Sequence, residues 1–257
     1  MSSGRPHPDL ATRALGWRRA CRAAVCDVVE PWAHGTVLRA TDYPDYYEYN
    51  VVRVEDDPQM SVAELVVFAD EALAGLAHRA VDFEIAAAAM PLRADFSALG
   101  WQAQPLLWMH HETAPPPGPD IAVETVAYEA VQALRVDWLR ADGFPDYDPD
   151  EFHAQARRVA EARDVQVLAV HAAGEPIAFA HIEHVGDGAE ISQVYVDPRY
   201  RGDGRGTALT RAAIVAAGNK RDLWICADDE GRPKELYARL GFRPAVTTME
   251  FLRMPPA

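Results

Sequence analysis

The chain has 257 residues, of which 49% are hydrophobic and 25% charged, with a formal net charge of −14. This composition is typical of a globular protein with one large or two small domains, and its apolar runs fall far short of the ~18 residues of a membrane span. The negative charge argues against nucleic acids and anionic membranes as partners, because both attract clustered lysine and arginine.

The N-terminal residues MSSGRPHPDL contain no apolar core of the kind that directs secretion. Cys21, Cys26 and Cys226 make an odd number of cysteines at spacings that do not suit a metal, which favours a reducing environment. Two pairs of nearby histidines also lack a third ligand at a suitable spacing. We therefore expect a cytoplasmic protein without a bound metal.

The first half of the chain is expected to hold a strand at Asn50–Glu55, a helix at Ser61–Ala77 and a strand at Ala80–Ile85. It ends at HETAPPPGPD (111–120), whose three consecutive prolines cannot continue a helix or a central strand. The sequence therefore predicts two domains, at residues 1–113 and 121–257, joined by a semi-rigid linker at 114–120.

The second half alternates between strands and helices, and the turn-rich GFPDYD (143–148) separates its first two helices. The pattern predicts an α+β domain, with a mixed and mostly antiparallel sheet flanked by helices. Strands are expected at Ile121–Val126, Val165–His171, Pro176–Val185, Ala189–Val196, Asp222–Ala227 and Val246–Leu252, and helices at Ala127–Asp142, Pro149–Arg163, Gly206–Asn219 and Pro233–Leu240.

The two halves of the chain share a pattern. The segment Phe96–Trp101 (FSALGW) precedes Tyr237–Phe242 (YARLGF) by 141 residues, and the elements upstream of each keep the same spacing to within one or two residues. This favours an internal duplication. One difference separates the copies, since the second has RGDGRG at 201–206 where the first has QMSVAE at 59–64, without a glycine.

A strand, a glycine-rich loop and a helix follow one another at Val194–Leu209 (VYVDPRYRGDGRGTAL). The first turn of a helix offers unpaired N–H donors and the positive end of the macrodipole, and glycines let the backbone curl close to an anion. Arg201 would add a charged contact. The spacing fits neither a dinucleotide-binding motif nor a P-loop. The loop is thus a candidate phosphate site, with a plain tight turn as the alternative.

The pattern Arg201-x-x-Gly204-x-Gly206 after a V-x-V-D-P strand, followed by L-Y-x-x-L-G-F at 236–242, resembles the GCN5-related N-acetyltransferase (GNAT) superfamily. The first segment is similar to the pyrophosphate loop of that family, and the second to its usual C-terminal motif. The loop-less first half resembles tandem GNAT proteins whose N-terminal copy is degenerate. The resemblance implies two tandem GNAT-like domains, each with a mixed sheet flanked by helices, and acetyl-CoA as the cosubstrate.

The resemblance also implies binding roles. Loop N–H groups would hold the CoA pyrophosphate, and the preceding strand would pair with pantetheine where it splays from Asp222–Ala227. An amide of Val194 or Val196 would polarise the thioester carbonyl. The implied acetyl-CoA site consists of Val194, Tyr195, Val196, Arg201, Gly202, Asp203, Gly204, Arg205, Gly206 and Thr207.

Tyr237 is the implied acid that protonates the departing CoA thiolate, with packing beside Phe242 as its alternative role. The first copy has Phe96 at the matching position, which cannot donate a proton. Chemistry is therefore expected only in the second copy.

The attacking amine must lose a proton, so a base is needed. Glu190 is the candidate, because a period of two would place it on one strand face with Ser192, Val194 and Val196. The alternatives are Glu183, His184 and a chain of water molecules.

Some positions depart from the family pattern. Glu230 lies seven residues before Tyr237, where many members carry asparagine, and Pro233 replaces a usual alanine. Asp203 places an acid near the expected phosphates, and Arg205 is positioned to offset it.

The sequence favours an N-acetyltransferase that moves an acetyl group from acetyl-CoA to a primary amine by direct attack in a ternary complex. The alternative is a non-catalytic acyl-CoA-binding or regulatory module. A third hypothesis makes the first domain a structural substitute for a homodimer partner, so that the chain is a monomer rather than a dimer. The sequence carries no code for the acceptor, which is expected to be a small-molecule amine.

Overall fold

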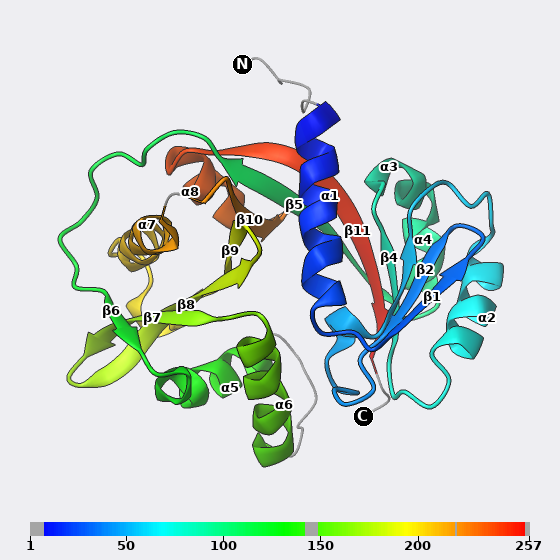
Figure 1. The fold of residues 1–257 in the computed structure, drawn as a ribbon, viewed down its shortest axis with the longest axis horizontal. Coiled ribbons are helices and arrows are strands. Elements are labelled where there is room, and N and C mark those ends of the chain that lie inside the picture. The colour runs from blue at the N-terminus through cyan, green and yellow to red at the C-terminus, as the bar shows by residue number, and fades with distance from the viewer. Residues whose placement is uncertain (1–7, 142–148, 219, 255–257) are drawn as a thin grey trace. The chain divides into compact units, whose positions relative to one another are not determined.

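The computed structural model describes residues 8–141, 149–218 and 220–254 (Figure 1). Asp142 and Asn219, at the ends of two expected helices, lie outside the described residues, as do the expected turn at 143–148 and the first seven residues. The chain divides into two compact units. The first unit consists of residues 1–108, 227–231 and 245–257, and the second of residues 109–226 and 232–244.

The first unit is built on a sheet with the order β1-β2-β3-β4-β11. β1 to β3 are antiparallel, β3 and β4 are parallel, and β11 runs antiparallel to β4. Its elements are α1 (Pro8–Ala23), β1 (Val28–Trp32), β2 (Gly35–Arg39), η1 (Tyr47–Tyr49), β3 (Val51–Val54), α2 (Val62–Ala72), β4 (Arg79–Phe83), α3 (Ala86–Ala89), η2 (Met90–Leu92), α4 (Arg93–Ala98) and β5 (Gln102–His111).

The two faces of the first sheet differ in polarity. Alternate residues such as Val52, Val81 and Phe83 form an apolar core with α2 and α4. The opposite face carries Arg53 and Asp82, which are register partners on β3 and β4. Because α1 covers this face, its arginines meet carboxylates there rather than apolar side chains (Figure 1).

The second unit is built on a sheet with the order β10-β9-β8-β7-β6. β6 to β9 are antiparallel neighbours, whereas β9 and β10 are parallel. Its elements are β6 (Glu124–Val126), η3 (Tyr128–Val131), α5 (Gln132–Ala141), α6 (Pro149–Ala162), β7 (Gln166–Ala172), β8 (Glu175–Val185), β9 (Gly188–Val196), η4 (Pro198–Tyr200), α7 (Arg205–Ala217), β10 (Asp222–Asp228), α8 (Pro233–Arg239) and the first residues of β11 (Phe242–Arg253).

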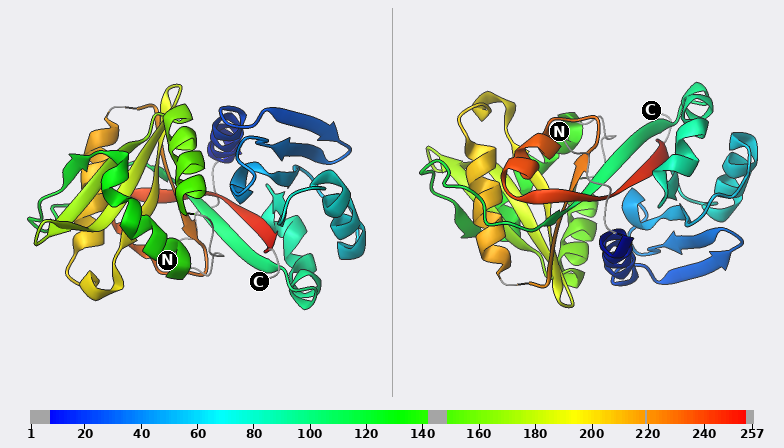
Figure 2. Two further views of the ribbon diagram at one scale, coloured as in Figure 1. Left: turned by 90° about the horizontal axis from the view of Figure 1, so that it is seen from below. Right: turned by 90° about the horizontal axis from the view of Figure 1, so that it is seen from above.

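Helices cover both faces of the second sheet, with α7 on one side and α5 and α6 on the other (Figures 1 and 2). On the α5 side, Val131 and Leu134 pack against Val167, Phe179 and Tyr195. The expected α+β architecture, with a mixed and mostly antiparallel sheet flanked by helices, is confirmed.

The compact units divide the chain differently from the expected linear boundaries. The last strand was expected to start at Val246 and to belong to residues 121–257, but β11 starts at Phe242, and its residues from Ala245 onward belong to the first unit. Met249 and Phe251 complete the apolar core of the first unit. The pairing partner of a terminal strand is set by long-range burial, which local patterns do not report.

The same order of elements occurs twice. β3, α2, β4, α4 and β5 correspond in order to β9, α7, β10, α8 and β11, and the pairs β3–β4 and β9–β10 are both parallel. The two helix starts differ in chemistry. The Ser61 side chain accepts a hydrogen bond from the Glu64 backbone, and the Glu64 carboxylate accepts one from the Ser61 backbone at 2.8 Å, so α2 caps its own first turn. An anion would meet an acidic residue there.

Among the described residues, no helix is both long and apolar enough to span a bilayer.

Candidate functional site

The glycine-rich loop connects β9 to α7 in the second unit. The Asp197 carboxylate accepts a hydrogen bond from the Arg199 backbone N–H at 2.9 Å, which closes the single turn η4. Gly202 and Gly204 then have φ angles of 98° and 84°, which glycine adopts without steric cost. Gly204 is the N-cap of α7. The two glycines therefore let the chain reverse and start a helix directly after the strand.

A cavity of about 970 Å³ is lined by this loop, the end of β9 and α8. The first N–H groups of a helix have no partner within it, and its macrodipole adds partial positive charge at that end. Of the ten residues expected to hold the cofactor, all but Asp203 line the cavity. The other lining residues are Tyr200, Arg232, Pro233, Glu235, Leu236, Tyr237 and Arg239.

The cavity lining is cationic although the chain as a whole is acidic. Arg201, Arg205, Arg232 and Arg239 line it, together with the acidic Glu235. Sequence patterns missed Arg232 and Arg239, although a signal was present, because residues 232, 235, 236 and 239 recur at helical intervals and share one face of α8. Clustered guanidinium groups beside a helix N-terminus favour a phosphate-bearing ligand.

Two of these arginines contact the loop itself. Arg201 Nε donates to the Val196 carbonyl at 2.9 Å. Arg205 Nη1 donates to the Tyr200 carbonyl at 3.1 Å and forms an ion pair with Asp203 at 2.7 Å. The negative charge of Asp203 is therefore balanced by Arg205 within the loop.

β9 has an unpaired edge beside the cavity. Its parallel pairing with β10 joins Gly188–Ile191 to Asp222–Ile225, and Ser192–Val196 lie beyond this register. The Asp197 N–H donates to the Ile177 carbonyl on β8 at 2.9 Å. Because N–H directions alternate along a strand, the amides of Val194 and Val196 point away from β8, toward the unpaired edge. An extended ligand could therefore pair with the main chain at this edge.

A β-bulge interrupts β9, and it corrects one expectation about the site. Phe179 pairs with Tyr195 and His181 with Ser192, so β9 contains one residue more than β8 over this stretch. Gln193, at the bulge, has a φ of 50°. Period-two alternation is thus broken. Glu190 and Ser192 share a face with Tyr195, and they do not share a face with Val194 and Val196 as expected.

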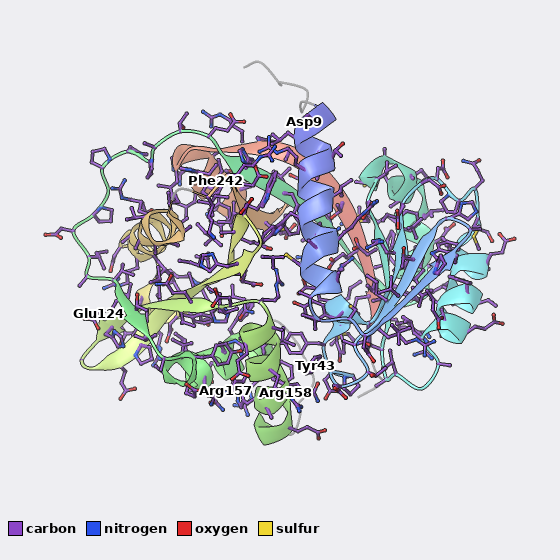
Figure 3. All side chains as sticks on the ribbon, viewed as in Figure 1. Asp9, Tyr43, Glu124, Arg157, Arg158 and Phe242 are labelled. Atoms are coloured by element: carbon purple, nitrogen blue, oxygen red, sulfur yellow. The ribbon has the colours of Figure 1, made fainter. Side chains whose placement is uncertain are left out.

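Tyr237 projects from α8 into the cavity and is 5% exposed. Its ring packs edge-on against Phe242, with ring centroids 6.3 Å apart, and Phe242 lies close to α8 in Figure 3. Burial raises the pKa of the Tyr237 hydroxyl well above its usual value, and Cys226 acts in the same direction. The hydroxyl therefore keeps its proton at neutral pH, and the two roles considered for Tyr237, packing and proton donation, are compatible.

Glu190 is buried and forms an ion pair. Arg163 Nη2 lies 3.4 Å from Glu190 Oε2, and Arg163 Nε lies 2.6 Å from Glu183 Oε2. Glu183 also accepts a hydrogen bond from the Ser192 hydroxyl. Arg163 follows α6 and is 3% exposed, so a buried guanidinium joins both candidate carboxylates. Both carboxylates are therefore buried rather than solvated.

The nearby histidines are held neutral. Burial lowers the pKa of His184, and Lys220 lowers it further. His181 is 1% exposed, and burial with the charges of Arg135 and Arg163 holds its pKa well below the usual value. A neutral imidazole can accept a proton, so His184 stays a candidate base. Within the described part of the chain, no three His, Cys, Asp or Glu side chains gather as a metal site.

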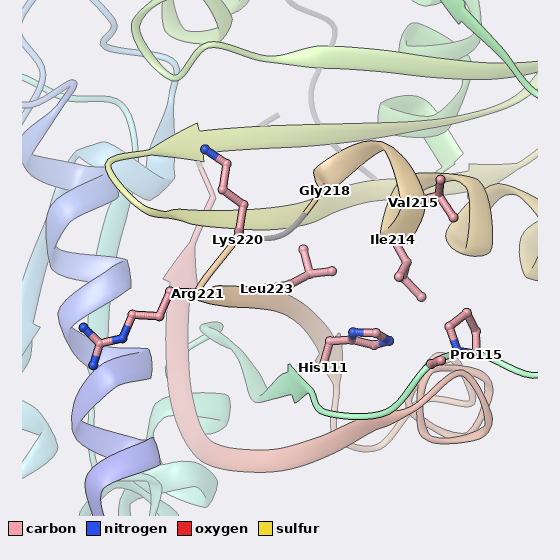
Figure 4. A pocket seen from close by; sticks show the side chains of 9 residues that line it. His111, Pro115, Ile214, Val215, Gly218, Lys220, Arg221 and Leu223 are labelled. Atoms are coloured by element: carbon pink, nitrogen blue, oxygen red, sulfur yellow. The ribbon is translucent and has the colours of Figure 1, made fainter.

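A second cavity of about 430 Å³ lies between the end of α7, β10 and the start of the proline-rich linker (Figure 4). The His111 ring points into it beside Ile214 and Leu223, whereas Lys220 and Arg221 point away from it. Its lining mixes apolar and polar residues, and it shares no lining residue with the glycine-loop cavity.

Solved structures share the overall fold. A functionally unknown conserved protein from Staphylococcus epidermidis aligns with a TM-score of 0.66 at 15% identity, over 90% of this chain and 95% of that one. A GCN5-related N-acetyltransferase from Kribbella flavida aligns with a TM-score of 0.56 at 17% identity, over 96% of each chain. A third, from Sphaerobacter thermophilus, gives 0.53 at 16% identity, over 80% and 74%. The fold is therefore GNAT-like.

Sequence comparison locates the domain. Residues 163–244 match the model of the acetyltransferase (GNAT) domain. Over 70 residues the chain is 40% identical to an uncharacterized N-acetyltransferase of Methanocaldococcus jannaschii, a match that covers 26% of this chain and 30% of that protein. Residues 163–244 are thus similar to the GNAT acetyltransferase domain, and the matched segment includes the glycine loop, β10 and α8.

Proposed function

We propose that this chain transfers an acetyl group from acetyl-CoA to a primary amine within a ternary complex. The observation that carries the proposal is the cavity of about 970 Å³, which joins the start of α7, the unpaired edge of β9 and the hydroxyl-bearing Tyr237 in one space. The matched GNAT domain includes each of these parts.

The residues present fit acetyl-CoA in shape and charge. Loop amides from Arg201 to Thr207 and the four lining arginines suit a pyrophosphate. The outward amides of Val194 and Val196 suit the amide groups of pantetheine, and one of them would donate to the thioester carbonyl. Glu64 and the self-capped α2 offer no comparable site, which supports one cofactor site per chain and a degenerate first copy.

The chemistry needs two proton transfers. The amine nitrogen attacks the thioester carbon, the C–S bond breaks, and Tyr237 gives its proton to the leaving thiolate. The proton of the amine passes to Glu190, either directly or through water. Glu183, His184 and a water chain are the alternative acceptors, because Arg163 stabilises the charged form of Glu190 and so weakens it as a base.

The competing function is a non-catalytic acyl-CoA-binding or regulatory module. Retention of Tyr237 in the cavity favours the enzyme, since binding alone would need only the loop and the strand edge. Incubation with acetyl-CoA and a panel of primary amines, followed by release of free thiol, separates the two. Tight acetyl-CoA binding without thiol release on any amine would establish the binder instead.

We further propose that the protein acts in the cytoplasm on a small-molecule amine, and that it is a monomer because the first unit replaces a second copy. A molar mass from light scattering that matches two chains would refute the last point. The acidic net charge is compatible with a cationic acceptor.

A further inference from the structure

The β9 bulge is held in a backbone conformation that is strained for its residue. Four non-glycine residues in the described part of the chain have positive φ, namely Gln59, Asp164, Ala173 and Gln193, and of these only Gln193 lies inside a strand. Left-handed conformations of residues with a Cβ persist where the surrounding structure over-determines them. Gln193 therefore needs a specific constraint.

That constraint comes from the segment that precedes and begins α5. Arg135 Nε donates to Gln193 Oε1 at 2.9 Å. Arg135 Nη1 donates to the Tyr128 hydroxyl at 2.6 Å, and the guanidinium carbon lies 5.4 Å from the Tyr128 ring centroid. Arg135 is 3% exposed, so it is a buried cation that is fixed on one side by Tyr128 and presents its Nε to the bulge.

The bulge decides which amides face the unpaired edge of β9. Because N–H direction alternates along a strand, a slip of one residue would exchange the two sets of amides. The amide of Val194 would then point toward β8 rather than toward the cavity that Val194 lines. A regular strand would thus remove the donor that the proposed function assigns to the thioester carbonyl.

We propose that Tyr128, Arg135 and Gln193 form a clamp that fixes this bulge, and that Arg135 and Gln193 are positioning residues for recognition of the acetyl carbonyl. This inference rests on the proposed function. The clamp sits on the α5 side of the sheet, away from the loop that holds the pyrophosphate. Its loss should therefore weaken recognition of the acetyl carbonyl more than binding of the rest of the cosubstrate, whose pyrophosphate is held by the loop.

The test compares affinities for acetyl-CoA and for CoA, which lacks the acetyl carbonyl, by isothermal titration of the full-length protein. Wild type should prefer acetyl-CoA. Gln193→Ala keeps the Cβ strain but loses the acceptor. We expect it to reduce the preference for acetyl-CoA about 3- to 10-fold, the value of one hydrogen bond, with a smaller loss of CoA affinity. Gln193→Gly relieves the strain, and its preference for acetyl-CoA should lie between those of wild type and Gln193→Ala.

Gln193→Glu retains an acceptor for Arg135 and should restore the preference. A wild-type preference in Gln193→Ala, an equal loss of both affinities, or a Gln193→Glu variant no better than alanine would overturn the clamp. Equal wild-type affinities would overturn it as well. A wild-type protein that binds neither ligand would refute the proposed function itself. These variants avoid removing the buried Arg135, so they are not expected to unfold the second unit.

Discussion

Glu190 lies directly opposite Glu183 in the β8–β9 ladder, and both carboxylates contact the buried guanidinium of Arg163. Like charges at register positions repel each other, and a shared cation reduces that repulsion. The distances are unequal, at 2.6 Å for Glu183 and 3.4 Å for Glu190. Glu183 is therefore the closer partner of Arg163, and Glu190 is the more distant one.

Replacement of Glu190 by glutamine should lower kcat about 100-fold while leaving the affinity for acetyl-CoA unchanged, because a general base acts on the amine and not on the cosubstrate. Steady-state kinetics across pH would measure this, and the acidic limb of the kcat profile should disappear in the variant. The matched control is Glu183→Gln, which should instead lower the free energy of unfolding by about 1–3 kcal/mol, since it weakens the closer partner of a buried charge. A larger kcat loss in Glu183→Gln would transfer the role of base to Glu183.

Tyr237→Phe should lower kcat about 100-fold, because the phenyl ring preserves the packing against Phe242 but has no proton to give. Burial raises the pKa of Tyr237, so wild-type activity should show no alkaline loss near pH 10, where an ordinary tyrosine ionises. Tyr200→Phe, in the same cavity, is the control and should retain wild-type kcat. Full activity of Tyr237→Phe would leave thiolate protonation to water.

Two of the three glycines in the loop, Gly204 and Gly206, should differ in their tolerance of alanine. At Gly204, φ is 84° and an added Cβ would lie 3.0 Å from Pro119 Cγ, so Gly204→Ala should lower the free energy of unfolding by about 1–2 kcal/mol and weaken acetyl-CoA binding. At Gly206 an added Cβ would meet Leu236 and Val196 at 3.7 Å, an ordinary contact. Gly206→Ala should stay within about 0.5 kcal/mol of wild type in denaturant melts. Equal effects would argue against a backbone role for Gly204.

The buried charges beneath α1 should make the first unit sensitive to pH. Arg18 contacts Asp82 at 3.0 Å and Glu250 at 3.2 Å. Burial, and then the neighbouring Asp82, raise the pKa of Glu250 from 4.5 to about 7. Between these values the folded state binds more protons than the unfolded state, so this carboxyl lowers the free energy of unfolding as pH rises from 4.5 to 7.

Glu250→Gln should remove that contribution. The free energies of unfolding of wild type and variant would be measured in denaturant at several pH values. As pH rises from 4.5 to 7, the value for wild type should fall relative to that of the variant. A difference independent of pH would show that the Glu250 pKa is ordinary in the folded protein. Arg18 and Arg22 lower the pKa of the neighbouring Asp82. Its carboxylate therefore raises the free energy of unfolding as pH rises through the acidic range.

The sequence by itself determined the features that depend on neighbouring residues. The loop at 201–207 was recognisable because positive φ requires glycine and a helix start attracts anions, and both effects act within a few residues. In the second half of the chain, the order of strands and helices followed from periodicity for the same reason. The first copy could likewise be distinguished because QMSVAE at 59–64 contains no glycine, and the structure adds the Ser61–Glu64 capping box there.

Only the tertiary structure decided where those pieces meet. The bulge at Gln193 places Glu190 and Val194 on opposite faces of β9. Arg163, which follows α6, forms an ion pair with Glu190. Most of β11 belongs to the first unit rather than to the second. Each depends on contacts between residues far apart in the chain. Burial of a charge or of a strand edge is settled by what packs against it, and no local pattern carries that information.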